Sequence, residues 1–305
     1  MLLSMQNKYI DLHMHSVNSD GCDTTQALLD QLFSLDVQII SFTDHDSVGC
    51  YYDLQGLVNI YGKSITVIKG CEFSFVYNNR IKHMLGYGID IDYIKSFLDY
   101  QYSLKSRIEK QHEYLDRFKA VCKSKGMIFD DSVTVSTGKT SEAFIALYYE
   151  LNKHPENILR FPFIVDNTIL YWNYYANIES EYYVSETKGI TSMEEILDII
   201  KKAGGLAFLA HPYAYMRDRT ANNELLKHAI KNGIDGIEIQ HSSNKEDDVD
   251  VLTEIALSHK LLRSGGSDFH GKIKPALKLV FGYDNMQVSF DEISEWIDKA
   301  GKIIF

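Results

Sequence analysis

The chain has 305 residues, 45% of them hydrophobic, and can bury a sizeable core as one large domain or two smaller ones. Its net charge of −11 at pH 7 argues against a large nucleic-acid surface, although bound cations would let it accept a small anionic substrate. No apolar run approaches the roughly 18 residues of a membrane span, and the first residues are too polar for a signal peptide. We therefore expect a cytoplasmic protein without a membrane segment, whose four cysteines are reduced thiols.

Short apolar segments and helical segments alternate along the first 90 residues. Strands are predicted at residues 9–15, 37–43, 65–68 and 81–87. A helix is predicted at residues 24–35, with Asp23 or Thr24 as its N-cap.

The alternation stops between residues 90 and 187. A long, charged helical pattern covers residues 93–125, a second one covers 142–150, and residues 159–183 are dense in Tyr, Phe and Trp. We therefore predict an inserted, mainly helical and aromatic-rich subdomain at residues 91–189. The simplest role for its aromatic residues is packing between the insert and the rest of the protein. The alternative is that some of them cover the active site and contact the substrate.

Alternation resumes in the last third of the chain. Ser192 and Glu195 form a capping box for a helix that ends near Ala203. Further strands are predicted at residues 206–210, 236–239 and 261–262, and further helices before Gly233 and at residues 249–257. Such alternation implies parallel strands, and sites in such folds lie at the carboxyl ends of the strands.

Histidine and acidic residues gather at or just past these strands. His13 and His15 are two apart in a strand, so both side chains lie on one face and can bind the same cation. A lone histidine in such a place is more often structural, but scattered structural histidines would not favour one end of a fold. The candidate ligands are His13, His15, Asp20, His45, Glu72, His83, His211, Asp268 and His270.

Nine ligands are too many for one ion, because zinc takes three or four protein ligands and a catalytic ion keeps one position open. Two or three ions fit if a carboxylate bridges them. A set of imidazoles and carboxylates without thiolate suits Zn, Mn or Fe. The sequence therefore predicts two to three divalent transition-metal ions.

Six motifs together resemble the polymerase and histidinol phosphatase (PHP) family. They are DLHMHSVNSDG at 11–21, FTDHD at 42–46, GCE at 70–72, HMLGYGID at 83–90, AHP at 210–212 and GGSDFH at 265–270. Their order and spacing match the family across residues 9–90 and 190–275. The resemblance implies an α/β fold, a distorted (β/α)7 barrel built by residues 1–90 and 190–305, with the insert at 91–189 capping the active site.

The resemblance also implies a trinuclear site. The first ion would be held by His13, His15, Glu72 and Asp268. The second would share Glu72 as a bridge and add His83 and His211. The third would be held by Asp20, His45 and His270. Ions this close lower the pKa of a bridging water, and we expect the resulting hydroxide to hydrolyse a small phosphomonoester.

Four further residues are candidates for contacting the substrate. Arg217 and Arg219 follow His211 closely, and arginine has a planar fork that suits phosphate. Lys139 could reach the site from the insert, and His241 could protonate the leaving oxygen. The alternatives are solvated loop charges for the arginines and a structural role for His241.

The insert resembles that of the bacterial branch that removes phosphate from nucleoside monophosphates and short 5′-phosphorylated nucleotides. That branch carries a Gly-Arg-Pro-His stretch, where this chain has Gly138-Lys139-Thr140-Ser141. Histidinol phosphate is the second candidate substrate, and a short oligonucleotide stays open as a partner of the first reading. Two other classes also stay open, a metal-binding accessory module without turnover and a metal-dependent amidohydrolase.

Overall fold

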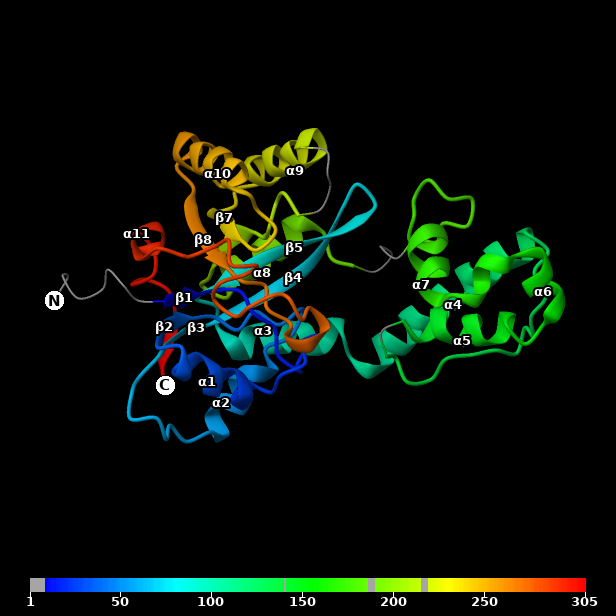
Figure 1. Ribbon diagram of the computed structural model, residues 1–305, viewed down its shortest axis with the longest axis horizontal. Coiled ribbons are helices and arrows are strands. Elements are labelled where there is room, and N and C mark those ends of the chain that lie inside the picture. The colour runs from blue at the N-terminus through cyan, green and yellow to red at the C-terminus, as the bar shows by residue number, and fades with distance from the viewer. Residues whose placement is uncertain (1–8, 140, 186–189, 215–218) are drawn as a thin grey trace. The chain divides into compact units, whose positions relative to one another are not determined.

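The computed structural model describes residues 9–139, 141–185, 190–214 and 219–305, and the chain divides into two compact units (Figure 1). The first unit consists of Met1–Ser96 and Thr191–Phe305, and the second of Phe97–Ile190. The boundary crosses helix α3, Ile91–Gln101, so the first half of that helix lies in the first unit. Among the described helices, none combines the length and the apolar character that a bilayer span requires.

The strands of the first unit form two sheets. The four-stranded sheet has the order β1 (Tyr9–Asp11), β2 (Val37–Ile40), β3 (Thr66–Ile68) and β9 (Lys302–Ile304). The five-stranded sheet has the order β4 (Gly70–Tyr77), β5 (Arg80–Tyr87), β6 (Leu206–Leu209), β7 (Gly236–His241) and β8 (Leu262–Gly266). Strands β1, β2 and β3 run parallel to one another, and so do β6, β7 and β8.

The prediction of parallel strands is wrong for β5, which pairs antiparallel with both β4 and β6. A turn at Asn78 and Asn79 joins β4 to β5, with φ of 48° and 57°. Positive φ at two successive residues is typical of the two-residue hairpin turn, and asparagine tolerates it well. In the resulting register Ser74 lies opposite His83, so Glu72, two residues from Ser74, lies on the same face as His83.

Backbone contacts also link the two sheets. Met14 and Phe269, just beyond β1 and β8, form a parallel bridge, and the Leu12 N–H donates to the Gly265 carbonyl of β8 at 3.2 Å. Beyond β2, His45 forms a parallel bridge with Glu72 of β4. The segments that follow β1 and β2 are therefore held against strands of the other sheet.

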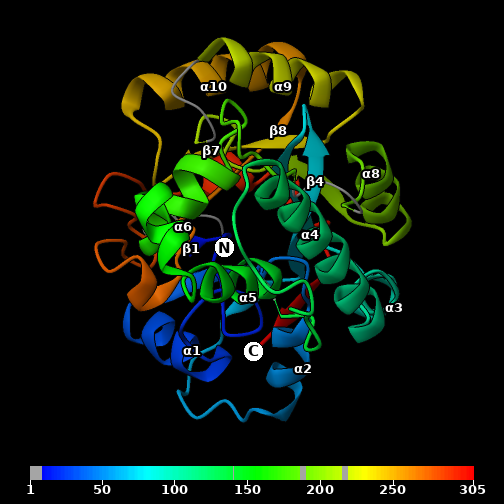
Figure 2. The same ribbon diagram turned by 90° about the vertical axis from the view of Figure 1, so that its right-hand side faces the viewer.

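Two helices of the first unit begin at the N-cap residues that the sequence predicts. Helix α1 (Thr25–Ser34) begins where the Thr24 hydroxyl accepts the Ala27 N–H, and it packs on α2 (Gly49–Gly56). Helix α8 (Met193–Lys202) begins where the Ser192 hydroxyl accepts the Glu195 N–H. The remaining helices are α9 (Arg219–Lys231), α10 (Glu246–His259), η4 (Gly271–Ile273) and α11 (Phe290–Ile293). Helix α10 packs on β7 and β8 (Figure 2).

The second unit has a core of its own. Its helices are α4 (Leu104–Ser124), α5 (Glu142–Leu151), α6 (Pro155–Arg160), η2 (Pro162–Val165), α7 (Asn167–Ile169) and η3 (Leu170–Tyr175). The single helical pattern predicted at 93–125 is two helices, because the Ser103 hydroxyl accepts the Ser106 N–H and caps α4. From the aromatic-rich segment, Tyr175 and Tyr182 belong to the core cluster of this unit, and Tyr175 packs edge-on against Phe118.

Candidate metal centre

Two of the sequence motifs meet through backbone hydrogen bonds. The His15 N–H donates to the Phe269 carbonyl at 2.9 Å, and the Asp268 N–H donates to the His13 carbonyl at 2.8 Å. The two segments directly follow β1 and β8. The side chains of His13, His15 and Asp268 are therefore brought together at the carboxyl ends of these strands, where the sequence predicted a site.

Glu72 on β4 is fully buried at the centre of the cluster. Its Oε2 lies 3.0 Å from His13 Nε2, 3.3 Å from His15 Nε2 and 3.2 Å from His45 Nδ1, and its Oε1 lies 2.9 Å from His211 Nε2 and 3.3 Å from His83 Nδ1. One carboxylate thus faces five imidazoles, and its two oxygens face different ones.

Two aspartates complete the cluster. Asp268 Oδ1 lies 3.1 Å from His15 Nε2. Asp20 Oδ2 lies 3.3 Å from His270 Nε2 and 4.0 Å from His45 Nε2. All nine candidate ligands thus lie in one cluster. Among the described residues, four groups of potential ligand atoms lie within 4.8 Å of one another: His13, His15, Glu72 and Asp268; His45, Glu72 and His83; His15, Asp20, His45 and His270; and His13, Glu238 and His241.

Burial and charge set the protonation of the cluster. Burial lowers the pKa of His83 to about 3 and that of His45 to about 4, so both rings are neutral at pH 7. Burial also lowers the pKa of His15, but its hydrogen bonds to Asp268 and Glu72 outweigh burial and raise that pKa to about 9. Burial raises the pKa of Glu72, yet the imidazoles around it hold that pKa well below its usual value, so Glu72 is ionised.

The residues of the cluster fit transition-metal ions. The buried Nδ1 of His45 has no hydrogen-bond partner within the described residues, although it lies 3.2 Å from Glu72 Oε2. A neutral imidazole that points its nitrogen at a shared carboxylate is suited to completing a coordination sphere. Imidazole and carboxylate donors together favour Zn, Mn or Fe over Mg or Ca.

Two buried aspartates that adjoin the ligands accept hydrogen bonds from neighbouring loops. Asp11 accepts the N–H groups of Ser267 and Val280 at 2.9 and 2.8 Å. Asp44 accepts both the N–H and the hydroxyl of Ser16. These carboxylates therefore fix the loops that carry the candidate ligands.

Sequence reasoning missed two residues that contact candidate ligands. Glu238 on β7 is fully buried, with Oε1 2.8 Å from His13 Nδ1, and its Oε2 accepts the His211 N–H at 2.8 Å. Lys274 donates from Nζ to Asp268 Oδ2 at 2.9 Å. The only sequence signal for Glu238 is a charged residue between two isoleucines of a predicted strand, which is an unusual place for an unpaired acid.

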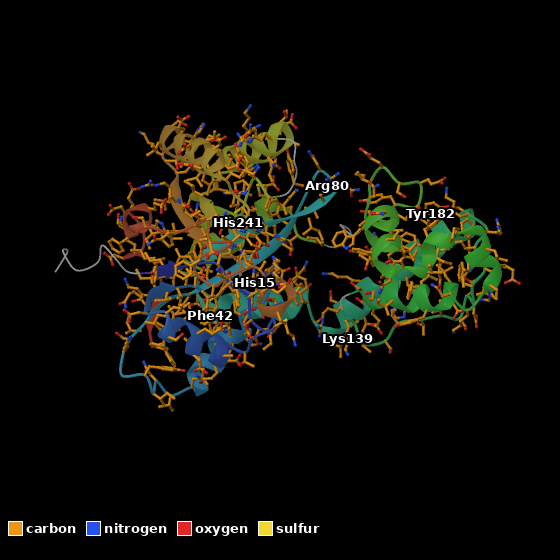
Figure 3. The ribbon with its side chains drawn as sticks, viewed as in Figure 1. His15, Phe42, Arg80, Lys139, Tyr182 and His241 are labelled. Atoms are coloured by element: carbon orange, nitrogen blue, oxygen red, sulfur yellow. The ribbon has the colours of Figure 1, made fainter. Side chains whose placement is uncertain are left out.

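His241, at the end of β7, is buried beside the cluster with its Nε2 3.6 Å from Asp268 Oδ2 (Figure 3). The Ser243 N–H donates to its Nδ1 at 3.1 Å. Because a backbone N–H can only donate, Nδ1 is an acceptor and the ring hydrogen of neutral His241 is on Nε2. His241 therefore presents an N–H toward the cluster.

Of the other three predicted substrate contacts, Arg219 and Lys139 are among the described residues and Arg217 is not. Arg219 on α9 pairs with Asp248 of α10 and lies over the ring of Tyr213. Lys139 is exposed in the second unit, in the loop before α5 (Figure 3). Arg217 and Thr140 lie outside the described residues.

The chain matches a known protein family. The PHP domain family matches residues 11–304. The chain is 26% identical to the 5'-3' exoribonuclease Rnm of Escherichia coli (strain K12), over 85% of this chain and 84% of the relative. It is 28% identical to a 3',5'-nucleoside bisphosphate phosphatase of Chromobacterium violaceum, over 86% and 87%.

A solved structure from Bifidobacterium adolescentis, of a proposed metal-dependent phosphoesterase, shares the fold. Its TM-score is 0.63 at 24% identity, and the match covers 96% of both chains. The family match spans nearly the whole chain, including every candidate ligand. This chain therefore belongs to the PHP domain family.

Proposed function

We propose that this chain is a metal-dependent phosphoesterase that hydrolyses a terminal phosphate of a small nucleotide. The observation that carries the proposal is Glu72, a buried carboxylate whose two oxygens face separate imidazoles. A carboxylate in that position suits a bridge between two ions. Membership of the PHP domain family and relatives that cleave phosphoesters support the same activity.

The first proposed ligand set coincides with one of the groups described above, and the other two divide the remaining donors as the family resemblance implies. His13, His15, Glu72 and Asp268 would hold the first ion, Glu72, His83 and His211 the second, and Asp20, His45 and His270 the third. When bound, such ions lower the pKa of a water and neutralise phosphoryl oxygens. The protein holds the ligand side chains in place. In the first group, backbone hydrogen bonds between the segments at His13 and Asp268 do this.

We also propose that the strands of the first unit form a distorted barrel. The bridge between Met14 and Phe269 and the bridge between His45 and Glu72 connect the two edges of the five-stranded sheet to the segments that follow β1 and β2. If these bridges count as neighbours, the strands close a ring in the order β1, β2, β4, β5, β6, β7, β8 and back to β1. This continuity supports a distorted seven-stranded barrel. We further propose that the second unit caps the site.

His241 would act on the substrate as a hydrogen-bond donor. Its Nδ1 already accepts the Ser243 N–H, so adding a proton there would set two N–H groups against each other. Donation from Nε2 to a phosphoryl oxygen is therefore favoured over transfer of a proton to the leaving oxygen.

Replacing His241 with alanine is expected to lower kcat by about 10²- to 10³-fold, as does the loss of one oxyanion donor. The fall should be equal for a nucleotide and for p-nitrophenyl phosphate, whose leaving group needs no proton. A fall confined to the nucleotide would indicate proton transfer instead. An unchanged kcat for both substrates would remove His241 from the reaction.

The substrate class is tested by a phosphate-release screen with Mn²⁺. The panel contains AMP, a 3',5'-nucleoside bisphosphate, short 5′-phosphorylated oligonucleotides, histidinol phosphate and a sugar phosphate. We expect turnover of the nucleotides, with the Glu72→Ala protein as the control for contaminating phosphatases. Metal-loaded protein that hydrolyses none of the panel would contradict the proposal.

Cleavage of a phosphodiester is a second candidate function, because the chain also resembles an exoribonuclease over most of its length. The same screen separates the two activities when mononucleotide release from an oligonucleotide is measured beside phosphate release. Mononucleotide without free phosphate would favour the nuclease.

A further inference from the structure

Glu238 has contacts that the proposed chemistry does not use. It lies on β7 between Ile237 and Ile239, and all three side chains are buried. One oxygen, Oε1, lies 2.8 Å from His13 Nδ1, and the other, Oε2, accepts the backbone N–H of His211 at 2.8 Å. A single buried carboxylate thus touches a candidate ligand of the first ion and one of the second.

The direction of these hydrogen bonds follows from their partners. A backbone N–H can only donate, so Oε2 is an acceptor. A neutral imidazole that offers Nε2 to an ion carries its ring hydrogen on Nδ1. Glu238 Oε1, 2.8 Å from His13 Nδ1, is placed to accept that hydrogen. The nitrogen that remains to offer a lone pair is Nε2, which lies 3.0 Å from Glu72 Oε2.

The second contact, between Glu238 and the His211 N–H, holds His211 in an unusual backbone conformation. His211 has φ of 27°, a conformation that residues other than glycine seldom adopt and that needs surrounding contacts to persist. Its N–H bond to Glu238 is such a contact. The ring of His211 reaches Glu72 Oε1 with Nε2 at 2.9 Å.

We propose that Glu238 is a positioning residue that fixes the His13 tautomer and the His211 backbone, and so prepares both sides of Glu72 for metal. The inference rests on the proposed metal site but not on the substrate. Carboxylates that hydrogen-bond a metal-binding histidine typically change metal affinity about 10- to 100-fold when they are replaced.

Glu238→Gln tests the inference because it keeps the size of the side chain and removes one acceptor. The His211 N–H requires an acceptor, so the amide oxygen must face it. The amide NH₂ then faces His13 Nδ1 and drives the ring hydrogen onto Nε2, the nitrogen that the ion needs. We expect the affinity of the metal-free protein for Mn²⁺ or Zn²⁺ to fall about 10- to 100-fold in competition with a chromophoric chelator.

A spectroscopic readout separates this role from simple packing. With ¹⁵N-labelled histidine, the metal-free wild type should show an Nδ1–H tautomer at His13 that metal-free Glu238→Gln protein loses. Glu292→Gln is the matched control, because Glu292 caps α11 by accepting the Ser289 N–H and should leave affinity and tautomer unchanged.

Wild-type affinity and tautomer in folded Glu238→Gln protein would overturn the inference. If that variant does not fold, Glu238→Asp takes its place, since it keeps both acceptors on a shorter side chain. We expect weaker metal binding from it as well, and unchanged binding would again overturn the inference. Because affinity is the readout, wild-type protein that binds metal but releases no phosphate would contradict only the proposed function.

Discussion

Replacing Glu72 with alanine is expected to reduce both metal content and phosphate release to background. The two oxygens of Glu72 face different imidazoles, so on the proposed assignment its loss removes a ligand from two ions at once. Each ion supplies several kcal/mol of charge stabilisation in the transition state, and 1.36 kcal/mol is a factor of ten. The expected fall in kcat/KM is therefore at least about 10³-fold.

Elemental analysis of the purified protein measures the metal content, and the best substrate of the panel measures the rate. Wild type should carry two to three ions per chain. Glu292→Ala is the control, because that carboxylate accepts the Ser289 N–H and the Gln240 side chain. Full metal content and activity in the Glu72→Ala protein would show that the ions bind elsewhere.

Local signals in the sequence predicted many of the elements of the first unit. Thr24 and Ser192 mark helix starts, and the hydroxyl of each accepts an N–H of the first turn. Strand β4 was not among the predicted strands. Lys69 and Gly70 interrupt the apolar pattern after Ile68, and the start of a strand of another sheet at Gly70 depends on which strands lie nearby in space. The antiparallel β5 likewise follows from a two-residue turn instead of a helix.

The gathering of the candidate ligands in one cluster was predictable, because metal chemistry limits which side chains can bind an ion and strands place them at one end of the fold. The residues that hydrogen-bond to the candidate ligands were not predictable. The role of Glu238 depends on His13, which approaches it from another strand, and no motif marks such a pair. The pairing of Arg219 with Asp248 is also a contact between two helices. The role of the second unit at the site stays a prediction.

Removing the ions with a chelator is expected to abolish activity reversibly and to lower thermal stability. An ion present at 100 times its Kd stabilises the folded state by about 2.7 kcal/mol, and each further site adds to this. The metal-free protein should nevertheless stay folded. Its cluster can balance charge internally, since the hydrogen bonds of His15 to Asp268 and Glu72 raise the pKa of that ring to about 9. Calorimetry with and without chelator measures the shift in Tm.

Adding back single metals tests which donors hold the ions. Six of the nine proposed ligands are imidazoles, which suit Mn, Fe and Zn, whereas Mg²⁺ prefers oxygen ligands and keeps its water. We therefore expect one or more of the transition metals to restore both Tm and phosphate release, and Mg²⁺ to restore neither. The Glu72→Ala protein, treated in the same way, should show little change in Tm. Equal recovery with Mg²⁺ would mean that oxygen donors dominate, and the assignment of the imidazoles as ligands would then be wrong.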